Sequence, residues 1–343
     1  MTNNFLEDIL SVSTVSGFES KGSEAFVNYL KPYVDRIEID CLGNAMAYRI
    51  ASLDAPMIMI EAHIDEIGFQ VIYIDDKGCV YLRRNGGIDM QCVVGSKVVI
   101  TTDTGCIHGV IGKTPIHLLT PSEREKIPEL SSLWVDTGLS SDEVKERVKV
   151  GDPVAYASNH QWLTDNRITS KALDDKIGVF VVAEVMRRLH ENSISNINVC
   201  GVATVQEEVG CRGAAISSFR VNPDINITID VDFATDVPGC SMTKYGDIKL
   251  GGGVIISRNL DNTPMLVEQM QEIAKAYDIK IQLSARPNST GGTNASRIQL
   301  SRQGVKTLSI GIPCRYMHTP VEMCDMRDVE TCINLIVDFI RCQ

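Results

Sequence analysis

Cys-x-x-Cys pairs are absent from this chain, although it contains 11 cysteines in 343 residues. A zinc ribbon and a thioredoxin-type redox centre both require such pairs, so both kinds of site are excluded. Most of the cysteines, including Cys200 and Cys332, stand beside apolar residues. This setting is typical of buried free thiols in a reducing compartment.

An excess of positive charge is missing as well. The chain carries 33 Lys and Arg residues against 44 Asp and Glu residues, which gives a net charge of −11 and a pI of about 5.1. Because affinity for nucleic acid is built largely from clustered Lys and Arg, we expect no nucleic-acid partner.

The sequence also lacks long apolar runs. No run approaches the roughly 18 residues of a membrane span, and residues 1–7 lack the basic and apolar regions of a signal peptide. We therefore expect no membrane partner and a cytoplasmic location. A hydrophobic content of 44% and a charged content of 22% are ordinary for a globular protein, here long enough for about two domains.

The apolar pattern changes twice along the chain. Residues 1–66 and 163–343 alternate helical segments, such as 176–189, with apolar strands, such as 197–205. This alternation predicts an α/β sandwich. Residues 67–162 instead contain short strands separated by turn signals, which predict a small β-barrel or sandwich. The barrel-like segment is therefore an insertion, and the two flanking segments form one discontinuous domain.

Acidic residues and histidines recur where the predicted buried strands end. Open α/β sheets bind their ligands outside the carboxyl ends of the strands, so we expect these side chains to converge. One further acid stands at the start of the helix predicted over 176–189. The six residues are His63, Asp174, Glu207, Glu208, Asp230 and His318.

Two divalent ions would explain this set of residues. His63 and Asp230 could hold one ion, and Glu208 and His318 the other, with Asp174 bridging them. Imidazole and carboxylate donors suit zinc or cobalt. Two dications would be offset by three carboxylates and a bridging hydroxide, so no uncompensated charge would be buried.

Two carboxylates remain for supporting roles. Asp65 lies two residues after His63, so on an extended chain it points the same way and can orient the imidazole. Glu207 would hold no metal and would stand beside the bridging water as general base. Taken singly, Asp174 could equally be a helix N-cap, with Asp175 as the cap if Asp174 binds metal.

Several segments around these residues follow one another in a characteristic order. They are AHIDEIGF at 62–69, PIHLL at 115–119, KALDD at 171–175, VQEEVG at 205–210, IDV at 229–231 with DVPG at 236–239, and MHTP at 317–320. Together they closely resemble the M42 metallo-aminopeptidases, of the glutamyl aminopeptidase or tetrahedral aminopeptidase type, over essentially the whole chain.

The resemblance implies a three-layer α/β/α catalytic domain with an inserted small β-barrel, residues 67–162, through which subunits associate. It also implies a cocatalytic zinc or cobalt pair, removal of N-terminal residues from peptides with a free N-terminus, and a large homo-oligomer, a tetrahedral dodecamer. The metal, base and orienting roles given above carry over onto the same residues. Asn294 departs from the pattern, because the family commonly has Asp there, which leaves the substrate preference open.

Other functions are compatible with part of this pattern. A related dizinc amidohydrolase, either a deacylase or a carboxypeptidase, would use the same ligands. Proteins resembling this family have also been labelled endoglucanases, but glycosidases need two carboxyl groups and no metal pair, so His63 and His318 favour metal. A non-enzymatic assembly scaffold with a vestigial site would be expected to lack a ligand, and none is missing.

Overall fold

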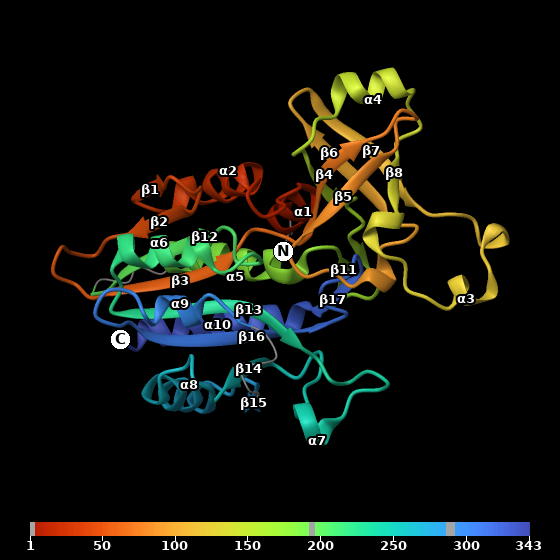
Figure 1. Ribbon diagram of the computed structural model, residues 1–343. Coiled ribbons are helices and arrows are strands. Elements are labelled where there is room, and N and C mark those ends of the chain that lie inside the picture. The colour runs from red at the N-terminus through yellow and green to blue at the C-terminus, as the bar shows by residue number, and fades with distance from the viewer. Residues whose placement is uncertain (1–3, 192–195, 286–291) are drawn as a thin grey trace.

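The computed structural model describes residues 4–191, 196–285 and 292–343 (Figure 1). Its strands form a mixed sheet of 11 strands and a separate closed barrel of six strands. The predicted α/β class with an inserted small barrel is therefore confirmed.

Four parallel strands at the centre of the large sheet determine where the site lies. β12, β3, β13 and β16 run in the same direction, with Thr204 opposite His63. Their carboxyl ends therefore meet at one edge. The strands in order across the sheet are β1 (Arg36–Ile39), β2 (Ala45–Arg49), β12 (Asn198–Thr204), β3 (Met57–His63), β13 (Ile225–Phe233), β16 (Lys306–Arg315), β17 (Glu322–Asp325), β11 (Arg167–Ser170) and β10 (Gln161–Trp162), while β14 (Val254–Ser257) pairs with β16 and β15 (Ile281–Ser284).

Helices cover both faces of this sheet, which confirms the three-layer arrangement. Successive residues of β2 alternate between two cores: Ala47 packs in the larger one and Met46 in the smaller one. The larger core is covered by α1 (Asn4–Ser11), α2 (Ser20–Leu30), α5 (Leu173–Glu191), α8 (Pro264–Ala276) and α10 (Met326–Arg341), and the smaller core by α6 (Arg212–Val221) and α9 (Ala295–Ile298). Short elements complete the chain: η1 (Lys31–Tyr33), η2 (Met90–Cys92), η3 (Ile116–Leu118), α3 (Pro121–Arg124), η4 (Leu130–Ser132), α4 (Ser141–Arg147) and α7 (Met242–Tyr245).

Helix α5 passes beneath the centre of the sheet and is almost wholly buried. It packs against β3, β12 and β13 and places Asp174 at its start. The Asp175 carboxylate accepts a hydrogen bond from the main-chain N–H of Gly178 at 3.1 Å, as a helix cap does. A Cβ atom at position 178 would lie 2.4 Å from that carboxylate, so any larger residue there would have to displace the Asp175 side chain. The sequence prediction of a helix start beside Asp174 is confirmed.

Helix α6 has no counterpart in the prediction. Its large apolar residues Ile216 and Phe219 are exposed, whereas its buried face consists mainly of small residues such as Ala214 and Ser218. An apolar stripe at helical spacing is the usual sign of a helix, and here the stripe is missing. The sequence pattern therefore could not reveal it.

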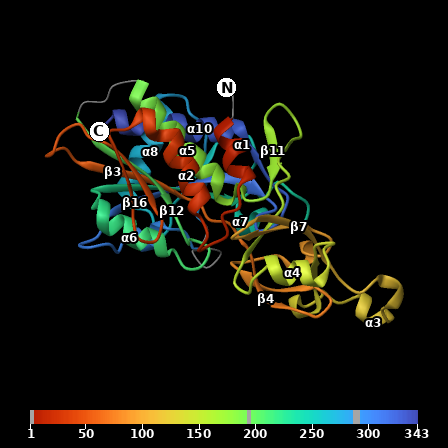
Figure 2. The ribbon, with the colours of Figure 1, turned by 90° about the horizontal axis from the view of Figure 1, so that it is seen from above.

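The barrel stands beside the large sheet rather than within its layers (Figures 1 and 2). Its closed order is β4 (Gly68–Ile74), β5 (Val80–Asn85), β8 (Trp134–Asp136), β7 (Gly105–Gly112), β6 (Lys97–Thr102) and β9 (Pro153–Tyr156). Phe69 and Tyr156 pack edge to face within its core. Residues 161–162 belong to the large sheet as β10, so the barrel strands end before the predicted boundary at 162. The domain boundaries as a whole stay a prediction.

Between β7 and β8 the chain leaves the barrel as an arm, residues 113–132, that projects away from the body of the protein (Figures 1 and 2). Ile116, Leu118 and Ile127 of this arm are exposed. Among the described residues, no helix is long and apolar enough to cross a membrane.

Candidate active site

The carboxyl edge of the four parallel strands opens into a cavity of about 740 Å³. All six residues that the strand-end pattern singled out line this cavity: His63, Asp174, Glu207, Glu208, Asp230 and His318. They come from β3, α5, the segment after β12, β13 and the loop after β16. The sequence therefore placed the residues correctly, and their individual roles stay predictions.

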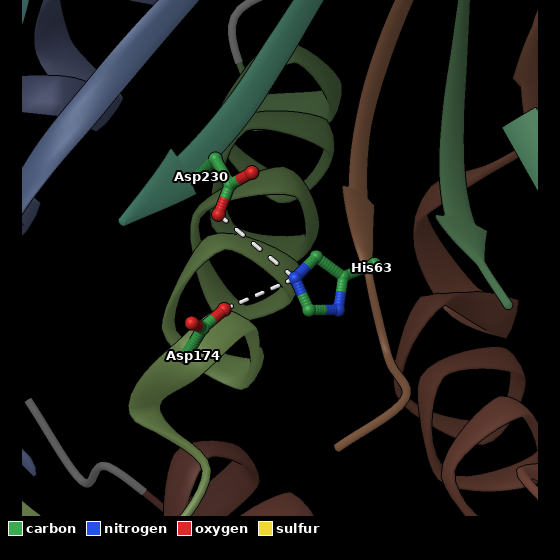
Figure 3. A group of neighbouring side chains, drawn as sticks. All are labelled: His63, Asp174 and Asp230. Atoms are coloured by element: carbon green, nitrogen blue, oxygen red, sulfur yellow. Dashed lines mark hydrogen bonds and ion pairs between the residues drawn. The ribbon is translucent and has the colours of Figure 1, made fainter. Parts of the chain in front are cut away.

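One group of possible metal ligands consists of His63, Asp174 and Asp230 (Figure 3). The Nε2 atom of His63 lies 3.1 Å from Oδ1 of Asp174 and 3.9 Å from Oδ1 of Asp230. Both carboxylates therefore face the same ring nitrogen.

A second group consists of Asp174, Glu208 and His318. The Nε2 atom of His318 lies 3.4 Å from Oδ2 of Asp174 and 3.8 Å from Oε1 of Glu208. Asp174 thus presents one oxygen to each histidine. Within each group, one ligand atom per residue lies within 4.8 Å of the others. A carboxylate shared in this way has the geometry of a bridging ligand.

The electrostatics of the cavity fit a cationic group. Burial raises the pKa of Glu208 and Asp230 well above the usual range, and the neighbouring charge of Asp174 raises both further. Burial would lower the pKa of His63, but its hydrogen bonds to Asp174 and Asp65 raise that pKa instead. Several buried carboxylates therefore compete for few positive partners, and bound divalent ions would relieve this repulsion.

Glu207 belongs to neither group, although it stands next to both. Its Oε2 atom lies 3.9 Å from Nε2 of His63, and its Oε1 atom accepts a hydrogen bond from Sγ of Cys211 at 3.4 Å. Burial raises the pKa of Glu207. The side chain is thus oriented toward the first group without being one of its three members.

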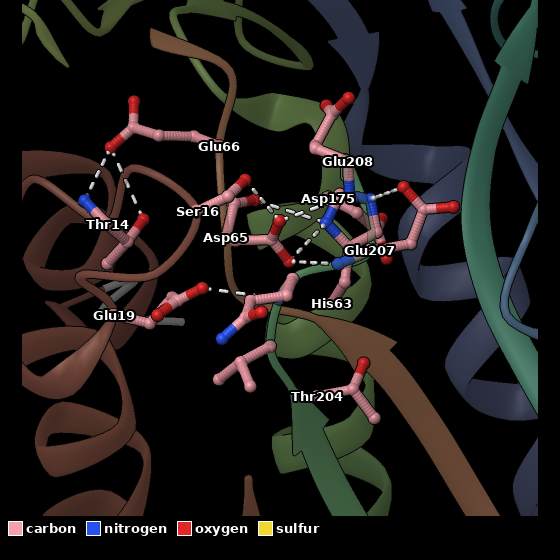
Figure 4. Close-up of polar contacts among 12 residues, drawn as sticks. Thr14, Ser16, Glu19, His63, Asp65, Glu66, Asp175, Thr204, Glu207 and Glu208 are labelled. Atoms are coloured by element: carbon pink, nitrogen blue, oxygen red, sulfur yellow. Dashed lines mark hydrogen bonds and ion pairs between the residues drawn. The ribbon is translucent and has the colours of Figure 1, made fainter. Parts of the chain in front are cut away.

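Asp65 does not line the cavity and stands two residues after the end of β3 (Figure 4). The Nδ1 atom of His63 is 3.1 Å from the main-chain oxygen of Asp65 and 3.5 Å from its carboxylate. That carboxylate accepts hydrogen bonds from the hydroxyl of Ser16 at 2.7 Å and from the main-chain N–H groups of Glu207 at 3.0 Å and Glu208 at 3.2 Å. Asp65 therefore contacts both the histidine and the segment that carries the two glutamates.

Glu322 is a supporting residue that the sequence did not reveal. Its carboxylate accepts the main-chain N–H of Asp174 and that of His318, each at 2.9 Å. Burial raises the pKa of Glu322 to about 8. It is the first residue of the short strand β17, and no local signal in the sequence marks it. Only the fold brings it beneath two of the expected ligands.

Asn294 lies in the interior below the site and not in the cavity wall. Its side chain is 1% exposed, and its Nδ2 atom donates to Glu61 at 2.9 Å and to Thr204 at 2.8 Å. An Asp in its place would set a second carboxylate against Glu61, so the amide is the side chain that fits here. Of the residues just before Asn294, Gly291 lies outside the described residues, while Gly292 and Thr293 line the cavity.

A buried ion cluster supports the site from below. Glu66 follows Asp65 directly, and its carboxylate contacts Nζ of Lys171 at 2.6 Å and Nζ of Lys176 at 3.1 Å. The two lysines are 2% and 0% exposed. Burial would raise the pKa of Glu66, but the two ammonium groups lower it to about 2. The cluster fastens the end of β3 to the start of α5.

Comparison with known proteins places this geometry in a family. The pattern of the M42 glutamyl aminopeptidase family matches residues 43–335. A lysyl aminopeptidase of Pyrococcus furiosus is 35% identical over 337 residues, which cover 96% of this chain and 94% of that protein. The crystal structure of a TET aminopeptidase from a marine sediment archaeon of the Thaumarchaeota superimposes with a TM-score of 0.93 at 34% identity, covering 99% of this chain and 95% of that one.

A third similar structure is the TET1 peptidase of Pyrococcus horikoshii, which can assemble into a tetrahedron or a large octahedral shell. It matches with a TM-score of 0.88 at 29% identity and covers 99% of both chains. The family pattern spans most of the chain, and relatives above 30% identity span nearly all of it. The protein therefore belongs to the M42 glutamyl aminopeptidase family of peptidases.

Proposed function

We propose that this protein is an aminopeptidase that uses two divalent metal ions, zinc or cobalt, to remove N-terminal residues from peptides. The main observation behind this proposal is that the two carboxylate oxygens of Asp174 face two different histidines. His63 and Asp230 complete the site of one ion, and Glu208 and His318 that of the other.

The donor set supports this assignment. Nitrogen and carboxylate oxygen donors match the preferences of zinc and cobalt. Bound ions would supply Lewis acidity and lower the pKa of an attacking water. Glu207 takes a proton from that water and returns it to the leaving amine. Asp65 and Glu322 hold the segments that bear the base and the ligands.

Removing the metal tests the proposed metal dependence, and blocking the N-terminus of the peptide tests the proposed aminopeptidase activity. Prolonged chelation should abolish hydrolysis of peptides with a free N-terminus, and zinc or cobalt should restore it. Undiminished activity in metal-free protein would exclude the metal assignment. N-acetylated copies of the same peptides should resist cleavage, since an aminopeptidase acts on the free terminus.

The alternative hydrolase functions predict cleavage of different substrates. Preferential cleavage of blocked peptides would favour a deacylase, and release of C-terminal residues a carboxypeptidase. Cleavage of cellulose oligomers would favour an endoglucanase. A panel of aminoacyl substrates assayed with zinc, cobalt and manganese would also identify the preferred N-terminal residue and metal.

We further propose that the inserted domain, residues 67–162, joins subunits into a large homo-oligomer, a tetrahedral dodecamer. The arm at residues 113–132 supports this, because apolar side chains project from it into solvent, among them Leu118 at 75% exposure. Exposed apolar groups gathered on one projecting segment favour an association surface. The assembly of the Pyrococcus horikoshii relative is consistent with this proposal.

Light scattering coupled to size-exclusion chromatography tests the assembly. The wild-type protein should elute as a large oligomer, and Leu118→Asp should reduce its size. Leu53→Asp is the matched control, because Leu53 is 98% exposed on a loop of the catalytic domain. A monomeric wild-type protein at working concentration would refute the proposal. Deleting residues 67–162 would be a less clear test, because Gly87 of this domain lines the catalytic cavity.

A further inference from the structure

The segment that carries Glu207 and Glu208 has left the sheet, yet its main-chain N–H groups are satisfied one after another by side chains. The N–H of Val205 donates to Oδ1 of Asn44 at 2.9 Å, and that of Gln206 donates to Oε1 of Glu19 at 3.2 Å. The next two N–H groups donate to Asp65. Four successive amides are thus held by acceptors from three distant parts of the chain. Figure 4 shows two of these acceptors, Glu19 and Asp65.

Glu19 is the least obvious of these acceptors, and it is firmly anchored itself. Its side chain is 4% exposed, and its Oε1 atom also accepts the N–H of Gly17 at 2.6 Å. Its main-chain oxygen accepts the N–H groups of Gly22 and Ser23 at 2.8 and 3.1 Å, at the start of α2. The carboxylate therefore belongs to the residue that directly precedes α2.

That helix lies against the segment that directly follows β3. A Cβ atom at Gly22 would stand 2.7 Å from Cγ1 of Ile64, the residue that follows His63. The helix that begins after Glu19 thus packs closely against the residue next to His63. Gln206 has a left-handed backbone, φ +57°, which a residue other than glycine adopts at some cost. Its hydrogen bond to Glu19 helps to hold that conformation.

We propose that Glu19 is a positioning residue of the active site, which fixes the main chain at Gln206 and thereby aims the Glu207 carboxylate. This inference rests on the proposed role of Glu207 as general base. Glu19 does not touch the cavity that Glu207 lines, so it acts only through the main chain. Because a displacement of about 1 Å in a reacting group can cost 10²-fold in rate, a hydrogen bond at this point matters for turnover.

Two substitutions of Glu19 distinguish the effect of its acceptor position from the effect of its charge. Glu19→Gln keeps an acceptor oxygen at the same reach and removes the charge, so it should retain the wild-type kcat. Glu19→Asp keeps the charge but withdraws the acceptor by one methylene, so kcat should fall about 10- to 100-fold while KM and metal content change little. Hydrogen exchange of a peptide covering residues 205–210 should be faster in Glu19→Asp and unchanged in Glu19→Gln.

Asp328→Glu is the matched control. Asp328 is 1% exposed and accepts the N–H groups of Gly251 and Gly253, each at 2.7 Å, before β14. Its substitution also moves a buried carboxylate that binds two amides, but not those at 205–208. It should lower stability without changing kcat or the exchange of residues 205–210.

Each remaining outcome is decisive. If Glu19→Gln is as impaired as Glu19→Asp, charge matters and positioning does not. Faster exchange with an unchanged kcat, or unchanged exchange in Glu19→Asp, would also overturn the inference, as would an equal loss of kcat in Asp328→Glu. If wild-type protein cleaves no peptide with a free N-terminus, the aminopeptidase proposal fails. The exchange data then decide the Glu19 inference on their own, since they need no substrate.

Discussion

The Asp65 carboxylate accepts the main-chain N–H of Glu207 at 3.0 Å across 142 residues of sequence. The same carboxylate stands 3.5 Å from Nδ1 of His63. One buried acid therefore couples the proposed base to a proposed ligand.

Replacing Asp65 by Ala should disturb both residues at once. The N–H groups of Glu207 and Glu208 lose their acceptor, and loss of such supporting partners typically costs 10- to 100-fold in metal affinity or activity. We expect kcat to fall by about that factor, together with weaker metal retention in dialysis. Asp54→Ala, at an exposed loop position, should change neither quantity. Full activity of the Asp65→Ala enzyme would exclude a role for Asp65 in positioning the base or the metal ligand.

The two adjacent glutamates should respond differently to substitution. Glu207→Gln keeps the side-chain shape and removes the base, so metal content should stay near that of the wild-type protein. Turnover should collapse, since general acid–base catalysis typically contributes about 10²- to 10⁴-fold. Glu208→Ala removes a ligand, so metal should be lost and activity with it. Elemental analysis beside rate measurements checks this, and the reverse pattern would exchange the two roles.

Glu66 should be important for stability. Glu66→Gln leaves the ammonium groups of Lys171 and Lys176 buried without an anion, and breaking a buried ion pair in this way typically costs about 3–5 kcal/mol. Urea unfolding at fixed protein concentration should show a loss of this order. Asp103→Asn removes the partner of Lys149 in an exposed pair and should have little effect. Equal effects of the two substitutions would contradict the cluster's structural role.

The titration of Glu19 should make the free energy of unfolding fall as the pH rises. Burial raises its pKa from 4.5 to about 7, so the folded protein prefers the protonated form. Its contribution is fully present below pH 4.5 and is lost as pH rises through about 7. A tenfold change in proton affinity corresponds to about 1.4 kcal/mol, so the loss is about 3 kcal/mol at most.

Glu19→Gln has no such proton to release. The difference in unfolding free energy between wild-type protein and this variant should therefore shift in favour of the variant between pH 5 and pH 8. Denaturant unfolding at several pH values measures it. A difference that is constant with pH would show that Glu19 is already ionised in the folded protein at pH 5.

Strand ends carried most of the information that the sequence contained about the site. His63 and Asp230 follow or lie within β-branched, buried runs, and parallel pairing then brings them to one edge of the sheet. The turn-rich stretch from residue 67 likewise marked the barrel. Such signals are local, because hydrophobic periodicity and turn residues can be read within a few residues.

The supporting residues could not be found in this way. Glu322 and Glu19 look like ordinary surface acids in the sequence, and their roles follow from main-chain amides to which they are brought by folding. Helix α6 escaped notice because small side chains, and not an apolar stripe, form its buried face. Residues that come into contact only in the folded chain produce no periodic pattern in the sequence, so the sequence alone could not predict these contacts.

The barrel interrupts a site whose parts come from nearly the full length of the chain, with His63 before it and His318 close to the C-terminus. A chain that ends before residue 318 contains the whole of the first ligand group and only part of the second. Because ribosomes add residues from the N-terminus onward, the second group becomes complete only once residue 318 has been added. The order of the elements along the chain thus brings in the members of the two ligand groups one group after the other during synthesis.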